Sequence, residues 1–102
     1  MSTAPGMVIR ASPDRLMQVF IIDDIQYTFA AVISPPIPPL QVVEAQLSYE
    51  SPDDLTSTRS YQGTIEDGQL KLQFDNGPTI TATVESPIDV GQVEGQGVWE
   101  QN

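Results

Sequence analysis

The stretch that decides the fold is residues 61–85, YQGTIEDGQLKLQFDNGPTITATVE. Apolar and polar residues alternate before and after Asp67-Gly68, and again after Asn76-Gly77. Because successive side chains of a strand point to opposite faces, this alternation predicts strands with one dry and one wet face. Asp-Gly and Asn-Gly supply the positive φ that tight hairpin turns need. The stretch therefore predicts three antiparallel strands joined as a meander.

The same period of two continues through most of the chain and predicts an all-β protein. A further turn is expected at Asp23-Asp24, although it lacks glycine. Seven or eight short strands in about 100 residues indicate either a small antiparallel β-sandwich or an up-and-down β-barrel with meander connections. Residues 1–6 are expected to form an N-terminal tail and residues 7–102 a single domain. The predicted strands are 8–10, 16–22, 25–33, 40–50, 60–66, 69–75, 79–85 and 92–100.

Two proline-containing segments are predicted to connect strands. Ser51-Pro52-Asp53-Asp54 combines a capping serine, a proline at the first helical position and carboxylates in the first turn. This combination predicts at most one short helical turn, near residues 51–58. The run PPIPP at residues 35–39 favours the polyproline II conformation. We interpret it as a stiff crossover between two strands; the alternative is a ligand for an aromatic groove.

The composition excludes most catalytic chemistry. The 102 residues include four basic and 14 acidic residues, for a net charge of −10, and neither histidine nor cysteine. Nucleophile systems that use histidine, disulfides, zinc fingers and iron–sulfur sites are therefore excluded. The sequence predicts that the protein is not an enzyme and has no cofactor.

The charge and hydropathy also limit the partners. Binders of nucleic acid carry a basic footprint, and anionic membranes repel an acidic chain. The sequence therefore predicts neither a nucleic-acid nor a membrane partner. No secretory signal and no apolar run as long as a membrane span is visible, so a cytoplasmic location is expected.

Adjacent carboxylates in predicted loops are the candidate metal ligands. Calcium takes six to eight oxygen ligands, which several loops could supply together. The chain has no EF-hand spacing, and the alternative role of these carboxylates is turn capping and solubility. The candidates are Asp23, Asp24, Asp53 and Asp54.

Two further groups of residues are candidates for binding. Tyr27, Tyr49 and Trp99 are candidates to contact a guest inside a barrel. Tyr61 and Trp99 fall on inward rows by parity, and at an exposed edge either ring could stack on a sugar. Residues 16–22 are apolar on both faces except at Gln18, which indicates a central strand or one covered by a partner chain. The interface candidates are Leu16, Val19 and Ile21 on that strand, and Thr79, Thr81 and Thr83 in one polar row.

Together these features predict a non-enzymatic binding or assembly module whose partner is an unspecified protein or small ligand. If residues 16–22 lie at a sheet edge, they would template a homodimer through strand pairing. Two alternatives remain open. One is a carrier of small apolar ligands inside a barrel. The other is a lectin-like carbohydrate-binding module assisted by calcium.

Overall fold

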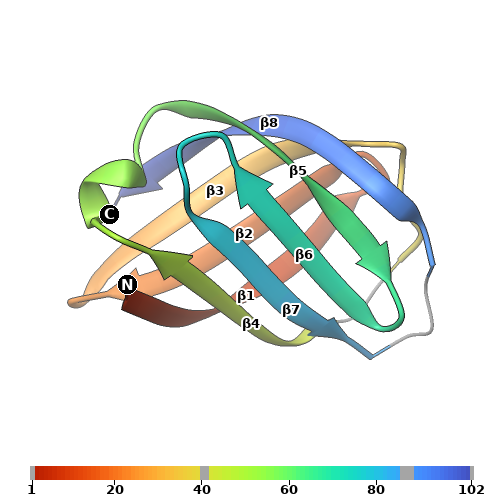
Figure 1. Cartoon of the computed structure of the whole chain (residues 1–102), viewed down its shortest axis with the longest axis horizontal. Helices are drawn as coiled ribbons and strands as arrows, with labels where there is room; N and C mark the ends of the chain where they lie inside the picture. The colour runs from red at the N-terminus through yellow and green to blue at the C-terminus, as the bar shows by residue number, and fades with distance from the viewer. Residues whose placement is uncertain (1, 40–41, 86–88, 102) are drawn as a thin grey trace.

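Eight antiparallel strands close into a barrel (Figure 1). The computed structural model describes residues 2–39, 42–85 and 89–101. Neighbours around the barrel follow the order β1-β2-β3-β8-β5-β6-β7-β4, and β4 pairs with β1 to close it. The all-β prediction is confirmed, and the chain forms the barrel rather than the sandwich. The elements are β1 (Ser2–Ser12), β2 (Arg15–Ile22), β3 (Ile25–Ser34), β4 (Val42–Tyr49), η1 (Pro52–Asp54), β5 (Thr58–Glu66), β6 (Gln69–Phe74), β7 (Thr79–Val84) and β8 (Gly91–Gln101).

The barrel consists of two three-strand meanders, each followed by a strand that crosses to the other meander. β1, β2 and β3 form the first meander, and β5, β6 and β7 form the second. β4 lies between β7 and β1, and β8 lies between β3 and β5. Residues 2–6, expected as a tail, instead form the start of β1 and pair with β4.

The two-residue turns have the backbone geometry that antiparallel hairpins require. Asp23 and Asp24 have φ of 51° and 65°, and Asp67 and Gly68 have φ of 54° and 75°. Left-handed conformations at both central residues are those of a type I′ turn, which matches the twist of the strands. The turn predicted at Asp23-Asp24 without a glycine is therefore confirmed.

The turn after β6 differs from the expected two-residue form. Only Gly77 has a positive φ, of 118°, and its N–H donates to Phe74 O. Phe74 N also donates to Pro78 O, which makes the turn longer. The contribution of Asn76 comes from its side chain. Its Nδ2 donates a hydrogen bond to Asp54 O at 2.9 Å and so links this turn to η1.

Connections at the two ends of the barrel each bury one aliphatic side chain. The proline-rich segment joins β3 to β4, and its Ile37 is buried, with the N–H donating to Pro13 O. The crossover interpretation of this segment is confirmed. At the other end Ser51 caps η1 by accepting a hydrogen bond from Asp53 N, and the following Leu55 is fully buried. The short helical turn is also where the sequence predicts it.

The interior is filled by the inward rows of the strands, with a cluster of rings at its centre. Phe29 contacts Phe74 and Trp99 with ring centroids 4.8 and 4.9 Å apart, and Tyr61 packs at 6.0 Å. Gly95 makes room for Tyr61, since a Cβ at this glycine would lie 2.7 Å from the Tyr61 oxygen. The Tyr61 hydroxyl donates to Val32 O at 2.6 Å across the same space.

Candidate interaction surface

One wall of the barrel exposes large hydrophobic side chains to solvent. Met7 is 54% exposed and Ile21 is 51% exposed, although the barrel has a complete apolar interior of its own. Every large exposed hydrophobic residue in the described part of the chain lies on β1, β2, β3 or β8, which are neighbours. We call this surface the apolar face and define it by the outward residues Met7, Ile9, Met17, Val19, Ile21, Ala30, Val32 and Val98.

Strand register makes the apolar face continuous. Ile9 pairs with Met17, Met17 with Ala30, and Ala30 with Val98, so one lateral row crosses all four strands. Directly paired side chains on one face of a sheet lie about 4.5–5.5 Å apart, within contact distance. In the next row Met7 pairs with Val19. The face is therefore one patch and not a set of isolated side chains.

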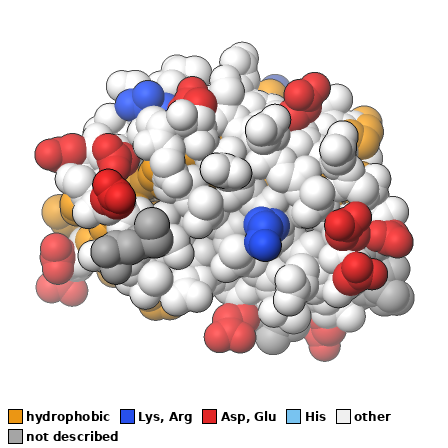
Figure 2. Space-filling model, viewed as in Figure 1, with side chains coloured by type: hydrophobic (Ala, Val, Ile, Leu, Met, Phe, Trp, Pro, Cys, Tyr) orange, Lys and Arg blue, Asp and Glu red, His pale blue; other side chains and the backbone are white. Residues whose placement is uncertain are grey.

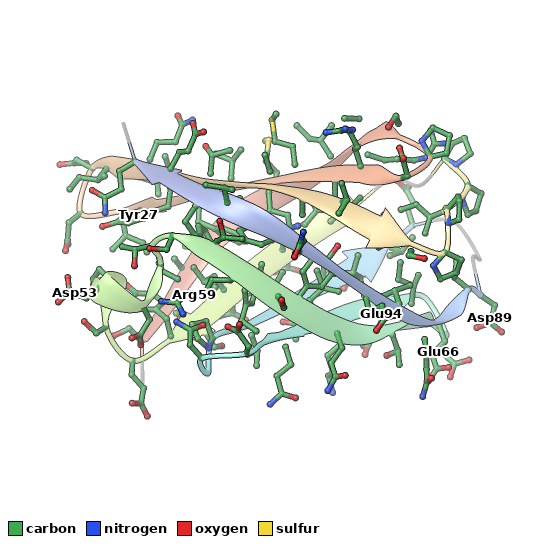
Figure 3. The ribbon with its side chains drawn as sticks, turned by 90° about the horizontal axis from the view of Figure 1, so that it is seen from above. Tyr27, Asp53, Arg59, Glu66, Asp89 and Glu94 are labelled. Carbon is green, nitrogen blue, oxygen red and sulfur yellow. The ribbon has the colours of Figure 1, made fainter. Side chains whose placement is uncertain are left out.

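The opposite wall is polar. Figure 2 looks onto β4, β7, β6 and β5 and shows almost no hydrophobic side chains in the middle of this wall. Carboxylates gather toward the two ends of that view. In Figure 3, Asp53 lies at one end of the barrel and Glu66, Asp89 and Glu94 at the other, while methionine sulfur atoms stand outside the wall of β1, β2 and β3. The barrel is thus amphipathic from one side to the other.

A hollow of about 350 Å³ lies within the apolar face. It covers the half of the face near Arg15, where Gly97 and Ala30 are small. Met17, Val32 and Val98 border it. The hollow can therefore accept an aliphatic side chain of a partner.

Two adjoining hollows of about 570 and 750 Å³ lie over β5, β6 and β8 and have a different chemistry. Both are bordered by Gln62, Gln73 and Glu94. Amide and carboxylate groups such as these form hydrogen bonds that water can also satisfy. Water can therefore cover these two hollows without a loss of hydrogen bonds, whereas the side chains of the apolar face gain from being removed from water.

The predicted interface residues separate into three places. Val19 and Ile21 belong to the apolar face, but Leu16 points inward and is buried, which corrects its assignment to an interface. The threonines of β7 lie on the polar wall, and Thr81 pairs with Gln46 and Lys71. β2 is also not an edge strand, because it pairs with β1 and β3. The edge that a strand-paired homodimer would need is therefore absent at β2.

The sequence prediction missed most of the apolar face. Met7 and Ile9 lie on a strand that was predicted only at residues 8–10, and Ala30, Val32 and Val98 occupy outward positions of strands whose inward rows gave the pattern. Apolar residues at the outward positions of the predicted strands could have indicated this face. Where these positions are apolar on several strands, pairing of those strands produces a patch.

The three predicted ring residues all lie inside the barrel. Tyr27, Tyr49 and Trp99 are buried, and Trp99 belongs to the ring cluster. Stacking on a sugar needs an exposed ring face, which none of the three presents. Tyr61 on β5 and Phe74 on β6 also pack against Phe29 in the interior.

The four candidate metal ligands have structural positions at turns. Asp23 and Asp24 form the type I′ turn, and Asp53 and Asp54 lie in η1. Within residues 2–39, 42–85 and 89–101, no three acidic side chains come together in a way that could hold a metal ion. The structure does not bring these two pairs into one site.

Two polar side chains in the interior have no hydrogen-bond partner among the described residues. Gln18 is fully buried with both amide atoms unpaired, and Trp99 Nε1 is also unpaired. Both lie in one inward row, in which Gln18 pairs with Phe29 and Phe29 with Trp99. Burial also raises the pKa of Tyr61 above its ordinary value, because the charged phenolate would lose hydration.

Comparison with models of protein families, with curated sequences and with solved structures finds no match for this chain. In the part of the chain that the structure describes, no helix has the length and hydropathy to cross a membrane.

Proposed function

We propose that the protein is a non-enzymatic binding module that joins a protein partner through the apolar face. The observation that carries this proposal is the placement of all large exposed hydrophobics of the described chain on four adjacent strands. Soluble monomers rarely expose apolar patches larger than a few hundred Å², and larger ones mark interaction sites.

The fold itself does not require these side chains to be apolar. The core is formed by the inward rows, and the outward rows of β5, β6 and β7 are polar on the same barrel. Burying apolar surface contributes about 25 cal/mol per Å². Contact between the apolar face and another surface would therefore be favourable, because it removes these side chains from water.

Site-specific photo-crosslinking tests the proposal. A photo-reactive residue at position 17 lies on the apolar face, and one at position 81 lies on the polar wall as a matched control. In cells that make the protein, we expect a discrete adduct from position 17 and none from position 81. Val19→Glu in the same chain should abolish the adduct, because a carboxylate cannot be buried in an apolar contact at low cost. Equal adducts from both positions, or none, would contradict the proposal.

A further inference from the structure

We infer that the partner of the apolar face is a second copy of this chain. The two copies meet face to face about a twofold axis that lies between them and crosses the strands near Val19. This inference rests on the proposed function, and it adds the identity and orientation of the partner. In such an arrangement β2 of one copy runs antiparallel to β2 of the other, so each half of one face meets the opposite half of its partner.

The shape of the face is self-complementary in this orientation. The hollow lies in the half that contains Met17 and Val32, whereas Ile21 projects from the other half. With the axis near Val19, Ile21 and Met17 are equally distant from it along β2. The symmetry therefore places Ile21 of each copy opposite Met17 of the other, at the border of the hollow, twice in one dimer.

The charges at the ends of the face agree with the same orientation. Arg15 borders the hollow at one end of β2, and Asp23 and Asp24 form the turn at the other end. A strand rise of about 3.3 Å per residue places these ends roughly 26 Å apart. The outward side chains between them on β2 are uncharged. An antiparallel pair brings each arginine to the two carboxylates of the other copy, whereas a parallel pair would put like charges together.

Asp14, beside Arg15, is already engaged within its own turn, where it accepts a hydrogen bond from Ser12 Oγ at 2.9 Å. It cancels one of the two positive charges at that end, where Arg10 pairs with Leu16 beside Arg15, so one positive charge remains.

The available surface is large enough for a stable dimer. A standard interface buries about 800 Å² on each partner. The accessible surface of one copy is 5707 Å², so such an interface would cover about one seventh of it. Four of the eight strands contribute to the face, which leaves room for this contact within one wall.

The absence of cysteine from the chain allows a direct test with single cysteines. Val19→Cys, Met17→Cys, Ile21→Cys and the control Thr81→Cys are treated with a short bifunctional maleimide, after circular dichroism confirms that each is folded. We expect Val19→Cys to form covalent dimers with itself, because it lies at the axis. A mixture of Met17→Cys and Ile21→Cys should give a several-fold higher yield of dimer than either variant alone. Sedimentation of the unmodified chain at micromolar concentration should show a dimer.

The outcomes separate this inference from the proposed function. A chain that stays monomeric, or that crosslinks best through Thr81→Cys, overturns the second copy as partner, while the adduct from position 17 still tests the proposed function. Preferred crosslinking of Met17→Cys with itself would show a parallel dimer and overturn the orientation. Loss of both the dimer and the adduct from position 17 would remove the proposed function as well.

Discussion

At the scale of single residues, the fully buried Gln18 is the least expected feature of the interior. Its neighbours on the inward row of β2 are apolar, and its amide finds no partner among the described residues. A buried polar group without a hydrogen bond costs about 1–3 kcal/mol. The rest of the core offsets this cost.

Replacing Gln18 with an apolar residue of similar length should stabilise the protein. For Gln18→Met we expect the free energy of unfolding to rise by about 1–3 kcal/mol, because the desolvation cost of the amide disappears. Urea denaturation measures this change. Gln73→Met, on the exposed outer side of β6, is the control and should change stability by less than about 0.5 kcal/mol. A loss of stability in Gln18→Met would show that the amide forms hydrogen bonds in the native protein.

Tyr61 should make the protein sensitive to alkaline pH. Burial raises its pKa, so the folded chain retains the phenolic proton at pH values where the unfolded chain, with a pKa of about 10, releases it. The stabilisation by Tyr61 is therefore complete below about pH 10 and is lost as pH rises further, by about 1.4 kcal/mol per unit. Urea denaturation at about pH 8 and about pH 11 measures this loss.

Tyr61→Phe is the matched control for this pH dependence. It removes the hydrogen bond to Val32 O, which should cost about 0.5–1.5 kcal/mol at neutral pH. Between the same two pH values the variant should lose less stability than the wild type. An identical loss in both proteins would assign the alkaline sensitivity to other groups.

At the scale of elements, strand positions follow closely from sequence, and turn details follow less closely. Seven of the eight predicted strands match the observed ones to within about two residues at each end that the structure describes, which is the usual uncertainty of such boundaries. Residues 40 and 41 of the predicted strand 40–50 lie outside the described residues. β1 is much longer than its predicted core of 8–10, because pairing with β4 and β2 extends it over Pro5 and Gly6. Neither residue favours a strand by itself, so only the neighbouring strands explain this extension.

The turn between β2 and β3 provides a test at this scale. Asp24 has a φ of 65°, which glycine adopts without cost and alanine does not. Asp24→Gly removes a left-handed strain of about 1–2 kcal/mol but adds an unfolded-state entropy cost of about 0.4–1 kcal/mol, so the free energy of unfolding should rise slightly, whereas Asp24→Ala should lower it by about 1 kcal/mol or more. Thermal unfolding at a concentration too low for association measures both. Similar changes in the two variants would mean that the lost carboxylate, and not the backbone, determines the effect.

At the scale of the whole molecule, the charge of −10 opposes the proposed self-association. The carboxylates seen from the polar wall gather toward the ends of the barrel (Figure 2), but on the opposite wall Glu100 of β8 lies in the row of Val19 and Thr28. Two acidic copies still repel over the range of the Debye length, about 30 Å at 0.01 M salt and about 8 Å at 0.15 M.

Added salt should therefore strengthen the dimer. Between about 0.01 M and 0.15 M salt we expect the dissociation constant of the dimer to fall several-fold, because screening reduces the repulsion more than it weakens the two exposed ion-pair contacts. Sedimentation equilibrium at the two salt concentrations measures it. A dissociation constant that rises with salt would show that local attraction between the copies outweighs the repulsion of their net charges.

The sequence by itself determined the all-β class, the turns at Asp23-Asp24 and Asp67-Gly68, the helical turn after Ser51 and the inward residues. These depend on local chemistry: the period of two, the positive φ that Gly and Asp tolerate, and the cap that serine provides. The binding-module prediction and the absence of enzyme activity remain predictions from composition.

Only the tertiary structure decided that β4 closes the sheet on β1, and it decided which outward side chains become neighbours. Closure requires pairing between strands far apart in the chain, about which local patterns carry no information. Ile9, Met17 and Val98 are therefore isolated apolar residues in the sequence and one continuous row in the barrel. The apolar face exists because strand order and register bring them together.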